Sequence, residues 1–189
     1  MLKIDEPSFL IALPGLRDQT FYQSVILLIE HNKEGALGFI INKKSNVPIS
    51  DLLEGPKQPQ IPSTMKAWVG GPVDTETGII LKPANASDKK GFTLTSNSDV
   101  LSEMVSQSTH INASEFVNAI MYPYRFLVGY TGWGPQQLDQ ELRNGFWLET
   151  EVNKDILFNC PWSNIWHTCI SSFGCNPESM VSVAQPFLN

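Results

Sequence analysis

The sequence predicts an α+β fold whose sheet is mixed and mainly antiparallel. Short apolar runs rich in β-branched residues fill the first half of the chain, and the helical patterns are short and lie mostly in the second half. No repeat, low-complexity tract or shift in composition divides the 189 residues, so a single domain over 1–189 is expected.

The first strands are predicted from three apolar runs, Phe9–Leu13, Val25–Ile29 and Leu37–Ile41. The gap between the second and third runs, residues 31–35, has the length and the glycine of a hairpin loop. We therefore expect an antiparallel pair over Val25–Asn42 at the centre of the sheet.

A proline-rich loop region follows, with Pro48, Pro56, Pro59 and Pro62, interrupted by a short helix over Ser50–Glu54 with Ser50 as its N-cap. Three further strands are predicted at Ala67–Val69, Gly78–Leu81 and Phe92–Leu94. A helix starts at Asn97 or Ser98 and runs through Val105, with Leu101, Met104 and Val105 on one face. A second helix begins at Ser114 and ends before Pro123.

The stretch GYTGWGPQQLDQEL follows a strand at Phe126–Val128. We expect residues 129–134 to turn the corner, with glycines at positive φ, and Pro135 to occupy the first turn of a helix that Gly145 ends. Leu138 and Leu142 would face the core. The chain then continues as a strand over Gly145–Val152 and closes with an amphipathic helix over Trp162–Phe173, stopped by Gly174.

Charge and composition narrow the function classes. The formal net charge is −6 with only 13 Lys and Arg residues. The sequence therefore lacks the excess of positive charge that binds phosphate backbones, which argues against direct DNA binding. No stretch approaches the ~20 apolar residues that cross a bilayer, and Asp5 and Glu6 stand where a signal peptide carries positive charge. A cytoplasmic protein without a membrane segment is expected.

Thiol and metal chemistry find little support in the sequence. Cys160, Cys169 and Cys175 are odd in number and contain no Cys-x-x-Cys pair, so reduced, mostly buried thiols are expected, with no disulfide framework, no structural metal and no cofactor. A zinc or thiol-protease site would need His167 beside a cysteine and a further partner such as His31 or His110, which sequence spacing does not supply.

A series of motifs resembles the bacterial YqgE/AlgH family, and it spans nearly the whole chain in order. The matching segments are residues 9–18 (FLIALPGLRD), 30–32 (EHN), 35–38 (GALG), Asn42, 70–73 (GGPV), 129–133 (GYTGW), 137–138 (QL), 141–142 (EL), 147–148 (WL), 156–158 (ILF) and 166–174. The resemblance implies a split sheet curled into a pseudo-barrel with flanking helices. Some members are labelled transcriptional regulators, but the family has no established activity or substrate.

Three positions depart from the pattern of the family it resembles. Ile29 stands where many members have a cysteine, so a redox role of that thiol does not carry over. Lys82 replaces a frequent histidine, and residues 183–188 (VAQPFL) replace a Gly-His-Ala ending.

Two groups of residues form the expected ligand or partner surface. The first is Gly132, Trp133 and Gly134, with Gly70 and Gly71 from the Gly-Gly-Pro turn. The G-x-x-G-x-G spacing is the reverse of a dinucleotide fingerprint, and a structural corner is favoured, although free N–H groups at 134–137 could hold an anion.

The second group is the polar cluster Glu30, His31 and Asn32 with Asn42. An acid and a base side by side could catalyse proton transfer, but neighbours on a strand point to opposite faces, so capping of the hairpin is favoured.

No catalytic constellation is recognisable, and no catalytic residue is expected. The favoured hypothesis is a non-enzymatic binding or regulatory protein that acts through protein partners. The alternative is an enzyme or a small-anion or nucleotide binder that uses the Gly-Trp-Gly-Pro corner. The oligomeric state stays open.

Overall fold

In the computed structural model, the described residues are 7–53, 60–85, 88–109 and 123–183. They form nine strands, which are β1 (Ser8–Ala12), β2 (Val25–Asn32), β3 (Gly35–Ile40), β4 (Lys44–Pro48), β5 (Lys66–Val69), β6 (Val73–Pro83), β7 (Phe92–Thr95), β8 (Arg125–Trp133) and β9 (Trp147–Glu151). The helices are α1 (Ser98–Thr109), α3 (Gln137–Arg143), α4 (Lys154–Asn159), α5 (Ile165–Ser172) and α6 (Pro177–Val183), with 3₁₀ turns at Ile49–Asp51 and Trp162–Asn164. The predicted helix from Ser114, and His110, lie outside the described residues.

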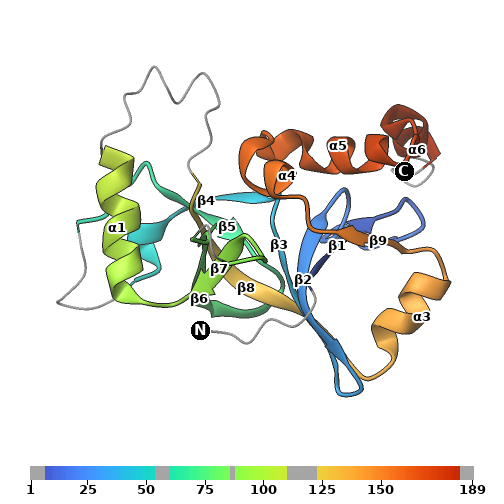
Figure 1. Ribbon diagram of the computed structural model, residues 1–189, viewed down its shortest axis with the longest axis horizontal. Helices are drawn as coiled ribbons and strands as arrows, with labels where there is room; N and C mark the ends of the chain where they lie inside the picture. Colours follow the sequence, from blue (N-terminus) through green and yellow to red (C-terminus); the bar gives the residue numbers. More distant parts are fainter. Residues whose placement is uncertain (1–6, 54–59, 86–87, 110–122, 184–189) are drawn as a thin grey trace.

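The fold class is α+β, with a mixed sheet that does not close into a barrel (Figure 1). Strands follow the order β4-β5-β8-β3-β2-β1-β9, and β6 pairs with both β7 and β8. Every pair is antiparallel except β5 with β8. The predicted pair at the centre is confirmed, because β2 and β3 are adjacent and antiparallel from Ile26↔Ile40 to Asn32↔Gly35.

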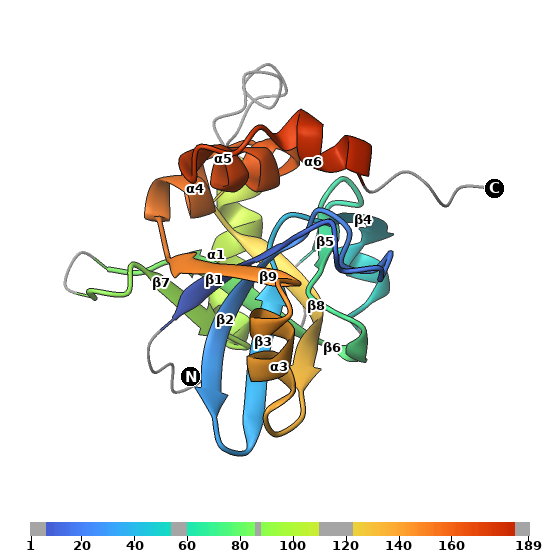
Figure 2. The same ribbon diagram turned by 90° about the vertical axis from the view of Figure 1, so that its right-hand side faces the viewer.

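β8 joins the two parts of the sheet. Its first half, near Leu127, lies between β5 and β6, whereas its second half, from Thr131 to Trp133, pairs with β3. Three apolar clusters follow from this arrangement. One lies under α4 and α5, one lies under α3, and one lies between the sheet and α1. Figure 2 shows α4, α5 and α6 along one side of β1 and β9, with α3 on the other.

Several predictions about elements need correction. The helix at Ser50 is only a 3₁₀ turn that starts at Ile49 and has Pro48 in the N-cap position. The helix predicted over Trp162–Phe173 is a 3₁₀ turn followed by α5, although Gly174 does follow its end at φ +73°. β4, α4 and α6 were not predicted. The helix α1 does bury Leu101, Met104 and Val105, as expected.

None of the helices within the described parts of the chain is long and apolar enough to span a bilayer.

Candidate functional site

The structure places the two groups of candidate residues in different surroundings. Trp133 is buried beneath α3 at 7% exposure, whereas Asn42 is buried beyond the far end of β3. Glu30 and His31 are both exposed. Because β2 continues through Asn32, these two neighbours project to opposite faces, as their strand position predicts.

The Gly-Trp-Gly-Pro corner differs from its prediction. β8 runs through Gly129 and Gly132 as far as Trp133, and α3 begins only at Gln137, so Pro135 is not in its first turn. Neither Gly132 nor Gly134 has a positive φ; Gln136, at φ +62°, makes the turn. Strand pairing with β3 explains the difference, since it holds Gly132 opposite Leu37.

Two of the N–H groups expected to hold an anion at this corner, those of Gly134 and Gln137, are engaged within the chain. The Gly134 N–H donates to Gln137 Oε1 at 3.0 Å, and the Gln137 N–H donates to the Gly134 carbonyl oxygen at 3.1 Å. The corner is thus closed by its own hydrogen bonds.

A carboxylate that the sequence analysis named only within the family motif, Glu141, holds this corner together. Glu141 Oε2 accepts from the indole nitrogens of Trp133 at 2.9 Å and Trp147 at 2.7 Å, and Glu141 Oε1 accepts from Gln137 Nε2 at 2.9 Å. The two indoles meet edge to face, with ring centroids 5.9 Å apart. Both indole N–H groups donate to the same carboxylate, so Glu141 holds α3 against β8 and β9.

The Glu-His-Asn cluster divides into two small interactions. Asn32 Nδ2 donates to Glu30 Oε1 at 2.5 Å, and Asn32 Oδ1 accepts from the Glu34 N–H at 2.8 Å, which caps the hairpin as expected. On the other face, His31 Nε2 lies 3.4 Å from Asp139 Oδ1 of α3. An open depression of about 540 Å³ lies there, lined by His31, Asn32, Lys33, Gln136 and Asp139.

Asn42 fastens the loop between β1 and β2, residues 13–24, to the sheet. Its Oδ1 accepts from the Val25 N–H and its Nδ2 donates to the Gln23 carbonyl oxygen, both at 2.8 Å. These two bonds join the residues just beyond β3 to the start of β2. Gln23 has φ +52°, a left-handed conformation that Asn42 helps to fix.

Gly70 and Gly71 mark a crossing of backbones. A Cβ atom on Gly70 would lie 2.2 Å from the Gly129 carbonyl oxygen, and one on Gly71 would lie 2.1 Å from the Tyr130 carbonyl carbon. Gly129, at φ +70°, completes the crossing. These glycines let two backbones approach closely, and Gly70 and Gly71 are buried.

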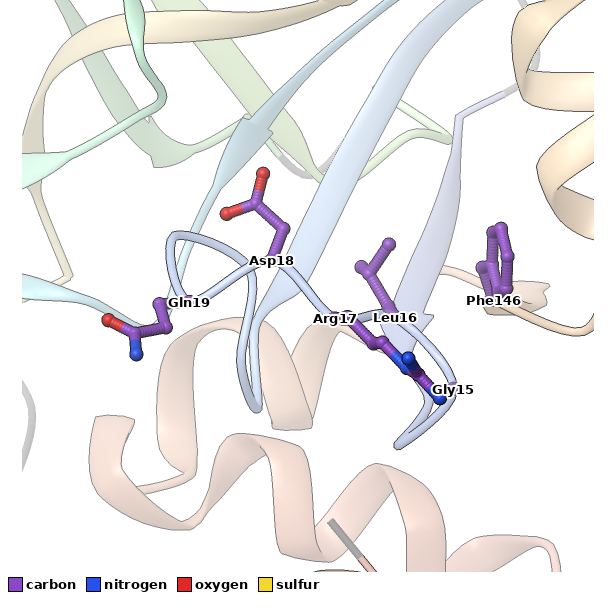
Figure 3. A pocket seen from close by; sticks show the side chains of 6 residues that line it. All are labelled: Gly15, Leu16, Arg17, Asp18, Gln19 and Phe146. Carbon is purple, nitrogen blue, oxygen red and sulfur yellow. The ribbon is translucent and has the colours of Figure 1, made fainter. Parts of the chain in front are cut away.

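The β1–β2 loop carries an open hollow of about 700 Å³, lined by Gly15, Leu16, Arg17, Asp18, Gln19 and Phe146. Figure 3 shows Leu16, Arg17 and Phe146 toward one end of this hollow and Asp18 and Gln19 toward the other. Sequence reasoning used residues 14–18 only for the resemblance. A Pro-Gly turn followed by Arg-Asp-Gln between two buried strands is the signal that could have identified this loop.

The loop is held from several sides. The Lys43 Nζ donates to the Thr20 carbonyl oxygen at 2.5 Å, and Phe21 meets the Trp147 ring edge to face at 5.6 Å. The Leu13 N–H donates to the Phe146 carbonyl oxygen at 2.9 Å. Burial lowers the pKa of Lys43, and the charge of Asp18 opposes that shift. The hollow therefore rests on a fixed framework.

Arg125 is a buried charge that no sequence pattern predicted. It is 2% exposed, its Nη2 donates to the Leu157 carbonyl oxygen at 2.5 Å, and its Cζ lies 5.0 Å from the Trp68 ring centroid. Burial lowers its pKa to about 10, which Cys160 partly opposes. Because Leu157 is in the last turn of α4, Arg125 satisfies a helix-end carbonyl.

The three cysteines are free thiols, of which Cys169 is buried and Cys160 and Cys175 are half-buried. Burial raises the pKa of Cys169 to about 12, with a smaller contribution in the same direction from Cys160. Cys160 Sγ lies 3.4 Å from Thr168 Oγ1. Across the described ranges, no three His, Cys, Asp or Glu side chains gather as they would to hold a metal ion.

Comparison with known proteins places these features in a family. The sequence profile of the AlgH-like family matches residues 9–178. A UPF0301 protein of Vibrio atlanticus is 33% identical over 91% of this chain and 93% of its own length. A UPF0301 protein of Thioalkalivibrio sulfidiphilus is 34% identical over 88% of each chain.

Two solved structures are similar in fold. The solution structure of the AlgH protein from Pseudomonas aeruginosa superposes with a TM-score of 0.68 at 27% identity, covering 97% of this chain and 95% of that one. Protein DIP2367 from Corynebacterium diphtheriae has a TM-score of 0.62 at 18% identity, covering 91% and 90%.

Proposed function

The chain belongs to the AlgH-like family, and from that premise we propose that it is a non-enzymatic binding protein of the cytoplasm with a regulatory role, exerted through a protein partner. The observation that carries the proposal is the β1–β2 loop. It displays Arg17, Asp18 and Gln19 to solvent while Asn42 and Lys43 fix its base. A displayed loop on a rigid scaffold is typical of recognition surfaces, because little ordering entropy is lost on binding.

The character of the hollow favours a protein over a small molecule. Sites for small molecules enclose most of the ligand, whereas Gly15, Arg17, Asp18 and Gln19 are all exposed around this hollow. Its lining combines opposite charges with the apolar Leu16 and Phe146, a mixture that suits a protein interface. The net charge of −6 argues against nucleic acid as the partner.

Site-specific photo-crosslinking in cells of the source bacterium tests this proposal. A photoreactive residue at position 19 is expected to capture one reproducible partner, and a second photoreactive residue at position 89, in the turn between β6 and β7, serves as the matched exposed control. The partner, once identified, is purified and titrated against the purified chain.

A charge reversal then assigns the contact to the loop. Arg17→Glu is expected to weaken binding of the purified partner by roughly tenfold or more, while Lys89→Glu leaves the affinity unchanged. Capture that is equal from positions 19 and 89, or an affinity indifferent to Arg17→Glu, would show that the loop is not the recognition surface.

A further inference from the structure

One margin of the sheet is open. β9 ends the strand order, and within the described part of the chain no strand lies beyond it. Figures 1 and 2 both place β9 on the outer side of β1, and Figure 2 shows α3 and α5 on either side of it. An exposed edge of this kind can take up a further strand.

The backbone groups that face outward can be assigned from the register. Leu13 and Phe146 are joined by a backbone hydrogen bond, and Ile11 pairs with Leu148 two residues along. In an antiparallel ladder the hydrogen-bonding direction alternates from residue to residue. Leu148 and Thr150 therefore bond to β1, and the N–H and C=O groups of Trp147, Glu149 and Glu151 point to the open side.

The side chains on this edge give it a definite charge pattern. Glu149 and Glu151 are exposed on the face that carries Trp147, and Glu149 Oε1 accepts from the Ser8 hydroxyl at 2.6 Å. Leu148, on the opposite face, is half-buried against the apolar cluster under α4 and α5. An incoming strand would thus meet carboxylates on one face and apolar surface on the other.

We propose that the β9 edge binds an extended segment of the partner protein as an additional strand, with Lys or Arg opposite Glu149 and Glu151 and apolar residues between them. This inference rests on the proposed function and names the chemistry of the partner. Phe146, the residue before β9, also lines the hollow of the β1–β2 loop, so the edge and the loop form one continuous surface.

A second copy of the chain is a poorer occupant of this edge. Antiparallel pairing of two β9 strands would bring the glutamates of one copy against those of the other, and like charges across a strand pair are destabilising. A basic partner segment turns the same two carboxylates into attractive contacts.

The test uses the full-length protein labelled with ¹⁵N, and the probe is a short peptide with uncharged termini, Thr-Lys-Val-Lys-Val-Lys-Thr. Two peptides serve as controls. One has Glu in place of each Lys, and the other has its three Lys and two Val in separate blocks. The alternating basic peptide is expected to bind at least about tenfold more tightly than either control. On binding, the amide protons of Glu149 and Glu151 should become protected from exchange, whereas those of Leu148 and Thr150 are already protected.

Variants at one position separate backbone pairing from charge attraction. Glu151→Pro removes an outward N–H without removing a bond to β1 and should weaken peptide binding beyond the effect of the matched Glu151→Gln. Glu149→Lys combined with Glu151→Lys should reverse the preference, so that the acidic peptide binds better. The strand-addition proposal is overturned if the alternating basic peptide binds no better than the peptide with separate Lys and Val blocks. It is also overturned if Glu151→Pro leaves peptide binding unchanged.

The two proposals fail separately. If position 19 captures a partner that Arg17→Glu releases but the peptide leaves the β9 amides unprotected, the inference about β9 is wrong and the loop proposal stands. If the peptide protects Glu149 and Glu151 but no partner contacts the loop, the loop proposal is wrong. A dimer of this chain that Glu151→Pro dissociates would identify a second copy as the occupant and overturn the inference.

Discussion

Gly129 and Gly132 are three residues apart on β8, and the fold needs glycine at only one of them. At Gly129, φ is +70° and a Cβ atom would lie 2.4 Å from the Gly71 carbonyl oxygen. At Gly132, φ is outside the left-handed region, and the nearest atom to a Cβ would be Tyr130 Cε2 at 3.4 Å. The middle of β8 therefore takes part in a close crossing of backbones, whereas Gly132, near the end of the strand, lies in ordinary strand conformation and is exposed to solvent. The spacing of glycines in the sequence did not distinguish the two.

The largest effect is expected at the crossing. Gly71→Val would place a Cβ atom within 2.1–2.5 Å of the Tyr130 carbonyl group and the Thr131 nitrogen, all of them backbone atoms in the middle of β8. Backbone cannot move aside as a side-chain tip can, so we expect a loss of about 3 kcal/mol or more in the free energy of unfolding. Urea denaturation followed by circular dichroism measures it. A variant that unfolds at the same urea concentration as the parent would mean that the crossing can open.

The sequence predicted the central elements because they carry strong local patterns. β1, β2 and β3 are apolar runs of the right length, and α1 has its apolar residues on one face. The edge strand β4 was missed because Lys44–Pro48 is mostly polar and has no apolar run. The short helix α4 was missed although Asn153 caps it by accepting from the Asp155 and Ile156 N–H groups.

A second large effect is expected at Trp133, the last residue of β8. Trp133 is 7% exposed and packs against Trp147 beneath α3, so Trp133→Ala should lower the free energy of unfolding by roughly 3–5 kcal/mol. Trp162, which is 41% exposed, provides the matched control, and Trp162→Ala should cost much less. Thermal and chemical denaturation of both variants give the comparison. Equal losses would show that burial does not set the difference.

The candidate surface was harder to predict than the fold, because its parts meet only through tertiary contacts. Glu141 joins Trp133 and Trp147 from positions eight residues after one and six before the other, a spacing with no local signature. Asn42 reaches Gln23 across 19 positions. Sequence patterns report periodicity along the chain, whereas these side chains act between elements, so the polar motifs were recognised but their partners were not.

The smallest effect is expected at Gly132, although the positive φ expected there from the sequence would make Gly132→Val destabilising. The structure reverses that expectation. The position is exposed and lies within a strand, where a β-branched residue is well accommodated and the unfolded chain loses the extra freedom of glycine. Among the described residues, apart from the two chain neighbours of Gly132, only the edge of the Tyr130 ring lies within 4 Å of the added Cβ, and it can shift slightly. The free energy of unfolding should therefore change by no more than about 0.5 kcal/mol.

Urea denaturation of Gly132→Val and Gly129→Val side by side measures the contrast. Valine at position 129 would have to adopt a positive φ, and its Cβ would clash with the Gly71 and Val73 carbonyl oxygens, so Gly129→Val should unfold the protein. Comparable losses from the two valines would mean that β8 requires glycine at both positions, and that Gly129 and Gly132 do not differ as the backbone geometry indicates.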